Sequence, residues 1–173
     1  TRLVSDWSSD VCSSDLKMVA QSPVSARLVA SVWVSRQQRR HASGMGDSAG
    51  RSRNTYRFDR NGTYRFDNET FQYHTPKYYL VREEGTYALD GDVLTVRPGS
   101  GMWSRHANTP TDPALDTGAT GHHVLRYRVQ FTSIYGRERL VLWPMDGNEN
   151  TRDGSFNFHD GDLQRAYLYD AED

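Results

Sequence analysis

The chain has 173 residues, a formal net charge of −1 at neutral pH and a single cysteine. This length fits one domain, which can bury a sizeable core without disulfide support. The balanced charge gives no general attraction to nucleic acid or to anionic membranes, and no apolar run approaches the roughly 18 residues of a membrane-spanning helix. Aromatic residues make up 12% of the chain, which favours an aromatic core over long disorder.

The first sixteen residues do not resemble folded protein. Residues 1–16 are dominated by Ser and Asp and follow neither a helical nor a strand period. The run Ser8–Leu16 resembles translated sequencing-adapter read-through, as found at the ends of proteins predicted from environmental assemblies. We therefore expect a non-native or disordered tail over 1–16, including Trp7 and Cys12, with the natural start missing. A single domain is expected over 17–173, with its core over roughly 26–170.

The first predicted element is the apolar run Ala26–Ser35, which we interpret as a strand. A helix over Val24–Val34 is the competing interpretation. The segment Gln37–Arg53 is polar and contains glycine, which predicts a loop. Its basic cluster is more typical of a solvated loop than of a nucleic-acid site, because the net charge is balanced.

Two near-copies of one pattern follow, at Thr55–Asp59 and Thr63–Asp67. In each copy large rings alternate with polar residues, which places the rings on one face of a strand. The intervening Asn61-Gly62 is typical of a hairpin turn, because both residues tolerate a positive φ. A second hairpin is predicted over Gly85–Val96, with its turn at Asp90-Gly91.

The middle of the chain alternates less clearly. Lys77–Arg82 predicts a strand after a break at Pro76, and Glu83–Gly85 predicts a turn. Pro98–Gly121 is the longest stretch without a predicted element, and a loop of this length in a compact domain is either functional or disordered. Trp103 within it is an apolar ring that is able to cap the mouth of a cavity.

The clearest strand of all is predicted over His122–Thr132. Four residues of one phase face one way, and these are Leu125, Tyr127, Val129 and Phe131. Arg139–Trp143 predicts a return strand, and two closing strands are expected on either side of Asp160–Asp162. The pattern predicts an all-β fold of about eight to ten short strands with little or no helix, either a sandwich or a barrel. We expect an antiparallel up-and-down meander barrel.

Four of these features resemble bacterial lipocalin-like domains, which are small calycin-type β-barrels. They are Val32-Trp33-Val34, the phrase Tyr56–Tyr64, the phrase Gly85–Val96, and Arg139–Leu142. The resemblance covers roughly residues 26–170. It implies non-enzymatic binding of a small apolar or amphipathic ligand inside the barrel, and a periplasmic or secreted location.

The candidate ligand contacts are the rings predicted to face the barrel interior, with Trp103 at the mouth. They are Tyr56, Phe58, Tyr64, Phe66, Tyr87, Trp103, Tyr127 and Phe131. In this hypothesis the apolar rings line a cavity and the tyrosine hydroxyls fix the orientation of the ligand. The alternative is a filled core with no ligand and a structural or protein-interaction role, since a barrel of eight strands is just wide enough for either.

Other chemistry is not indicated. There is no Gly-x-Ser-x-Gly motif and the only cysteine lies in the tail, so no catalytic residue is predicted. Asp153, His159, Asp160 and Asp162 share a loop region, but nothing pairs them as an acid and a base. The histidines His74, His106, His122 and His123 match no zinc spacing, and Asp146–Asn150 starts like a calcium loop but does not continue as one. We therefore expect no metal, no cofactor and no nucleic-acid partner.

Overall fold

The computed structural model describes residues 23–39, 50–73, 76–150, 152–154, 156–160 and 164–172. The predicted tail over 1–16, residues 40–49 of the first predicted loop, His74 and the turn residues 161 and 162 lie outside this part of the chain. Its elements are α1 (Pro23–Leu28), β1 (Val32–Arg39), β2 (Gly50–Phe58), β3 (Thr63–Gln72), β4 (Lys77–Asp90), β5 (Val93–His106), β6 (Ala114–Ala119), β7 (Leu125–Ile134), β8 (Arg137–Pro144), β9 (Phe158–Asp160) and β10 (Gln164–Glu172).

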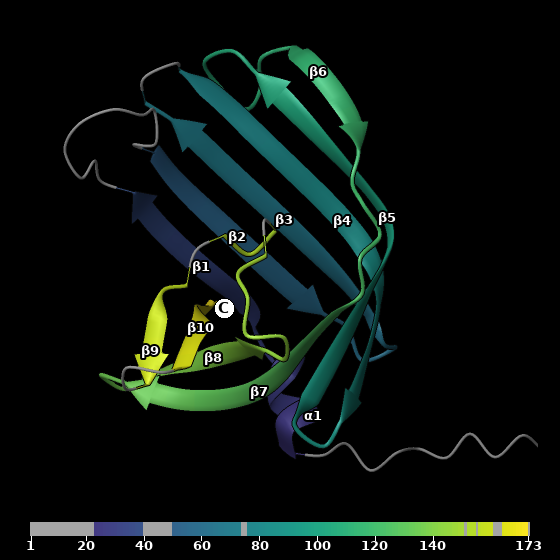
Figure 1. Ribbon diagram of the computed structural model, residues 1–173, viewed down its shortest axis with the longest axis vertical. Coiled ribbons are helices and arrows are strands. Elements are labelled where there is room, and N and C mark those ends of the chain that lie inside the picture. Colours follow the sequence, from purple (N-terminus) through teal and green to yellow (C-terminus); the bar gives the residue numbers. More distant parts are fainter. Residues whose placement is uncertain are drawn as a thin grey trace, which may run out of the picture.

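Eight strands form a closed antiparallel barrel (Figure 1). They are hydrogen-bonded in the order β1-β2-β3-β4-β5-β7-β8-β10, and pairing of β1 with β10 closes the ring. The remaining two strands are attached at the sides, β6 to β5 and β9 to β10. The predicted all-β, up-and-down barrel is therefore confirmed. No helix of the described residues is long and apolar enough to cross a membrane.

Both predicted hairpins form where the glycines place them. Gly62 and Gly91 adopt φ values of 83° and 61°, a region that L side chains rarely enter. The first turn is closed by the bond from the Asp59 amide to the Thr63 carbonyl, at 2.9 Å. Register follows from the turn, so that Tyr56 lies opposite Phe66. The repeated pattern therefore builds one continuous aromatic surface on the inner face of the sheet.

The first predicted strand is half wrong, and so is its helical alternative. Residues 23–28 form α1, and the strand β1 begins only at Val32. A proline at the first helical position favours the helix, while Trp33 and its neighbour pair with both β2 and β10. The Trp33 indole nitrogen donates to the Leu28 carbonyl at 2.8 Å, which fixes the helix against the strand. One apolar run thus serves two elements, which periodicity alone does not separate.

The predicted turn at Glu83–Gly85 and the predicted loop over Pro98–Gly121 are also wrong. β4 runs without interruption over 14 residues, and β5 is equally long, so residues 98–106 are strand. At Glu84/Gly85 the register shifts by a bulge, and the chain bends there without reversing. Pairing with β4 carries β5 through Pro98 and its glycines, and β6 occupies residues 114–119.

The ends of other elements differ by a few residues. β1 extends to residue 39 and β2 begins at residue 50, so the predicted loop over Gln37–Arg53 is wrong at both ends. β7 begins at Leu125, and the segment before it has no regular structure. The phase predicted within β7 is confirmed, because Tyr127 and Val129 are buried while Arg126, Arg128 and Gln130 are exposed.

The barrel closes tightly in one half only. β5 pairs with β7 through Val93–Val96 and with β6 through Met102–His106, while β1 pairs with β10 through three residues. Figure 1 shows β1 to β6 curving around the other half, with the chain between β8 and β9 crossing the space that they enclose. This β8–β9 connection brings polar side chains into the barrel, and they form the site described next.

Candidate ligand site inside the barrel

Packed rings fill the closed half of the barrel. Five of the predicted rings are at most 2% exposed, and these are Tyr56, Phe58, Tyr64, Phe66 and Tyr127. Tyr87 and Phe131 are partly buried against them. Ring centroids lie 4.8 Å apart for Tyr56 and Phe66 and 5.1 Å apart for Phe58 and Tyr87. Such pairs add to the stabilisation from burial itself, so this half of the interior is a solid core.

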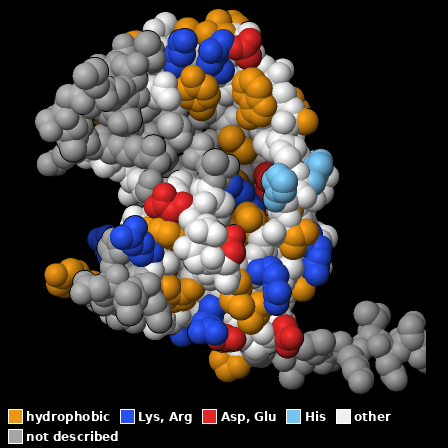
Figure 2. Space-filling view, viewed as in Figure 1, with side chains coloured by type: hydrophobic (Ala, Val, Ile, Leu, Met, Phe, Trp, Pro, Cys, Tyr) orange, Lys and Arg blue, Asp and Glu red, His pale blue; other side chains and the backbone are white. Residues whose placement is uncertain are grey.

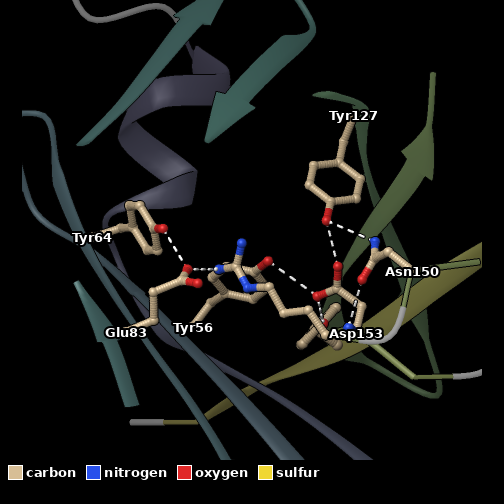
Figure 3. Close-up of polar contacts among 8 residues, drawn as sticks. Tyr56, Tyr64, Glu83, Tyr127, Asn150 and Asp153 are labelled. Carbon is tan, nitrogen blue, oxygen red and sulfur yellow. Dashed lines mark hydrogen bonds and ion pairs between the residues drawn. The ribbon is translucent and has the colours of Figure 1, made fainter. Parts of the chain in front are cut away.

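Asp153 anchors the β8–β9 connection inside the barrel. Its side chain is fully buried and accepts hydrogen bonds from three tyrosine hydroxyls. Tyr56 and Tyr169 donate to Oδ1 at 3.0 and 2.8 Å, and Tyr127 donates to Oδ2. The Asn150 side-chain oxygen accepts the Asp153 amide at 2.7 Å (Figure 3). A buried carboxylate requires such partners, and here they come from β2, β7 and β10.

The three tyrosines that bind Asp153 are held in their protonated form. Burial raises the pKa of Tyr56, Tyr127 and Tyr169 well above the ordinary value, and the nearby Asp153 charge raises it further. Each hydroxyl therefore remains a donor throughout the physiological pH range.

Arg152, the residue before Asp153, forms a buried ion pair with Glu83 of β4. Its Nη2 lies 3.0 Å from Glu83 Oε1, and the two side chains are only 11% and 4% exposed. The Tyr64 hydroxyl donates to the same Glu83 oxygen at 2.5 Å (Figure 3). The guanidinium also lies 4.3 Å from the centre of the Phe66 ring and 5.0 Å from that of Tyr56. It is thus enclosed by aromatic faces, which attract a cation.

The Arg152 guanidinium stays charged but is incompletely hydrogen-bonded. Burial alone would lower its pKa, but the surrounding groups, among them Tyr56, Asp153 and Glu83, outweigh burial and raise the pKa above the ordinary value. Nε, Nη1 and Nη2 are all buried, and none makes a hydrogen bond to the described part of the chain. The contact with Glu83 is therefore an ion pair without hydrogen-bond geometry. Buried donors without acceptors are costly and call for an explanation.

A cavity of about 390 Å³ lies beside this ion pair. Its apolar walls are Phe66, Val81, Pro98, Trp103, Ala119 and Leu125, and its polar lining includes Asn68, Glu83, Thr120, His123, Asn150 and Arg152. Figure 2 shows hydrophobic side chains on the upper part of this face of the molecule and histidine side chains at its edge. Apolar walls with a few convergent polar groups are typical of small-molecule sites, whose volumes begin at about 300 Å³.

Trp103 is held at this cavity by its strand partners. It lies opposite Val81 on β4 and opposite Gly118 on β6, on the inner face of the sheet. The ring packs directly over Gly118, where an added Cβ would meet the indole nitrogen at 2.6 Å. Trp103 remains 37% exposed, so part of the residue is open to solvent.

Only some of the eight predicted contact residues lie at the cavity. Phe66 and Trp103 line the cavity, and Tyr56 and Tyr64 lie behind it against Arg152. The other four, Phe58, Tyr87, Tyr127 and Phe131, are not in its lining. The sequence prediction missed Glu83 and Arg152. Glu83 shares the inward phase of Val81, a signal that would have been visible if Lys77–Asp90 had been interpreted as one strand.

The histidines of the described ranges do not form a metal site, and the hollow along β7 and β8 lies outside the barrel. No group of three or more His, Cys, Asp or Glu side chains in the described ranges is placed to hold a metal ion. His106 is instead bonded to Ser104 and to the Asp112 carbonyl. A hollow of about 920 Å³ along β7 and β8 is lined by outward residues such as Arg128 and Trp143, so it lies outside the barrel.

Comparison with known proteins leaves the geometry as the guide to function. No protein-family model, no curated protein and no solved structure matches this chain.

Proposed function

We propose that this protein binds a small apolar or amphipathic molecule, without chemical conversion, in the cavity of a lipocalin-like barrel. The observation that carries the proposal is the 390 Å³ space between the packed core and the open half of the barrel, with Trp103 on its wall. An eight-stranded barrel built only for stability has no need of this space, because its interior is just wide enough for side chains to fill.

The expected affinity follows from the apolar surface that such a ligand would bury. A two-ring aromatic molecule that buries about 300 Å² gains about 7.5 kcal/mol, which corresponds to a dissociation constant of a few micromolar. Loss of translational and rotational freedom offsets part of this gain. We therefore expect simple aromatic probes to bind more weakly than this, with dissociation constants above about 10 µM.

The test is a fluorescence titration with N-phenyl-1-naphthylamine, a neutral dye that brightens in apolar surroundings. Saturable binding of one dye per chain is expected for the wild type. In Val81→Phe the larger side chain takes up part of the cavity, and binding should weaken at least about tenfold. Leu80→Phe is the matched control, because Leu80 is the next residue on β4 and belongs to the opposite phase.

Two results would contradict the proposal. If the wild type takes up no dye, the interior behaves as a filled core, as the alternative without a ligand requires. If Val81→Phe binds as well as Leu80→Phe, the dye occupies another surface.

A further inference from the structure

We infer that the ligand carries a protonated amine, and that the Glu83 carboxylate receives this amine in the cavity. The inference rests on the proposed function and specifies its ligand class. It comes from one carboxylate oxygen of Glu83 that has no partner, and from the balance of the buried charges around that oxygen.

One oxygen of Glu83 is free to accept a hydrogen bond from the cavity. Glu83 is 4% exposed and belongs to the cavity lining. Its Oε1 accepts the Tyr64 hydroxyl and faces Arg152, whereas Oε2 makes no hydrogen bond within the described ranges. The buried polar atoms without a partner in these ranges include the three Arg152 nitrogens but not Glu83 Oε2. Oε2 therefore keeps accessible surface, and the space beside it is the cavity.

The buried charges near this oxygen leave an excess of negative charge. Two carboxylates, Glu83 and Asp153, lie around the single guanidinium of Arg152, which forms the ion pair with Glu83 and precedes Asp153 in the chain. The Asp153 carboxylate is held by tyrosine hydroxyls, which stabilise its charge but do not cancel it. A ligand cation at Oε2 brings the sum of these charges to zero, and a buried charge is costly unless it is paired.

The other polar groups of the lining leave this role to Glu83. The Thr120 hydroxyl is buried beyond the reach of a ligand. Asn68 and Asn150 are already hydrogen-bonded to neighbouring residues. His123 is exposed, so solvent screens its effect on a cation inside the cavity.

The walls suit the rest of such a molecule. Phe66 and Trp103 offer aromatic surface, which packs against rings and attracts a cation. Val81 and Leu125 add aliphatic surface, and the cavity volume of about 390 Å³ accommodates a compact two-ring molecule. The ligand class is therefore a compact, largely apolar primary amine.

The test compares three naphthalene compounds of similar shape as competitors of N-phenyl-1-naphthylamine on the full chain at pH 7.5. They are 2-naphthylmethylamine, which is a cation, 2-naphthylmethanol, which is a neutral donor, and 2-naphthoate, which is an anion. The amine is expected to displace the dye at a concentration about tenfold or more below that of the alcohol, because a charge-assisted hydrogen bond is the stronger one. The naphthoate should be the weakest of the three, because it adds to the negative excess.

Glu83→Gln tests the role of the carboxylate, because it keeps the size of the side chain and removes the charge. In this variant the advantage of the amine over the alcohol should disappear. Glu84→Gln is the matched control. Glu84 is the next residue on β4 and its side chain is 59% exposed, so the same charge is removed outside the barrel. The order of the three competitors in Glu84→Gln should be that of the wild type.

The outcomes separate this inference from the proposed function. Equal competition by the amine and the alcohol in the wild type, or the strongest binding by 2-naphthoate, would overturn the inference while dye binding still supports the site. This comparison decides even if Glu83→Gln does not fold. An unchanged advantage of the amine in a folded Glu83→Gln would also overturn the inference. Absence of dye binding to the wild type would remove the proposed function itself.

Discussion

Asp153 shows how one residue holds a long connection inside a barrel. Its carboxylate accepts from Tyr56, Tyr127 and Tyr169, and its backbone carbonyl accepts from the Asn54 side chain at 2.7 Å. These bonds connect strands β2, β7 and β10 to the β8–β9 connection. Arg152 is placed by the same anchor, because it is the adjacent residue.

We expect Asp153→Ala to destabilise the protein by about 3–5 kcal/mol, because it leaves three buried tyrosine hydroxyls without a hydrogen-bond acceptor. Urea unfolding followed by tryptophan fluorescence measures the change. Asn148→Ala, in the same connection but exposed, is the control and should lie within about 0.5 kcal/mol of the wild type. Equal stability of the two variants would refute the role of Asp153 as an anchor.

At the scale of single residues, the burial of the aromatic rings could be predicted from the sequence, but the burial of the charged side chains could not. The buried positions of Tyr56, Phe66 and Tyr127 follow from strand alternation and are confirmed. Arg152 and Asp153 lie in a connection that has no period, so no pattern indicates that they enter the core. Their burial depends on partners that are distant in the sequence, such as Glu83 and Tyr56.

At the scale of elements, the long β4–β5 pair shapes the site. The bulge at Glu84/Gly85 lets both strands continue past the closed half, which brings Val81 and Trp103 to the cavity. A Cβ on Gly85 would meet the Arg97 carbonyl oxygen and, at 2.9 Å, the Gly99 amide nitrogen. Both are backbone atoms, which do not move aside cheaply.

Gly85→Ala is therefore expected to cost about 1–3 kcal/mol of unfolding free energy through overpacking at the bulge. Gly99→Ala is the matched control, because a Cβ there meets its nearest atom at 3.5 Å, an ordinary contact. The midpoints of urea unfolding compare the two. A smaller loss for Gly85→Ala than for Gly99→Ala would show that the bulge does not depend on close backbone approach.

The same pair explains why the element prediction failed between residues 83 and 121. Glycine and proline clusters normally mark turns and loops, and Pro98, Gly99 and Gly101 fall in one stretch. Here Gly85 permits a close approach of the strand backbones at the bulge, which is the other structural use of glycine in a strand. Only the pairing partner distinguishes the two uses, and the partner is a non-local property. The hairpins at Gly62 and Gly91 were predictable because their signals are local.

At the scale of the whole molecule, the barrel combines a solid aromatic half with an open half that is lined by mixed side chains. The buried tyrosines of the solid half make the stability of the fold depend on pH. Burial raises the pKa of six of the ten tyrosines, namely Tyr56, Tyr64, Tyr87, Tyr127, Tyr167 and Tyr169. These residues keep their protons in the folded protein at a pH where the unfolded chain has lost them.

Stability is accordingly expected to be unaffected by these groups below about pH 10 and to fall as the pH rises further, because unfolding then releases tyrosine protons. Absorbance at 295 nm, recorded beside circular dichroism during alkaline titration, measures both events. Much of the tyrosinate signal should appear only together with unfolding. Complete tyrosine ionisation near pH 10 with the fold intact would contradict the buried hydroxyl network.

The most direct test of the account is an NMR titration of the ¹⁵N-labelled protein with N-phenyl-1-naphthylamine. The indole N–H of Trp103 and the amides of Val81 and Thr120 at the cavity should shift. The indole N–H of Trp33, bonded to the Leu28 carbonyl at 2.8 Å, should stay in place as an internal reference. Shifts confined to the cavity lining are the predicted result. Absence of shifts at saturating dye, or shifts confined to the outer face of β7 and β8, would contradict a ligand site inside the barrel.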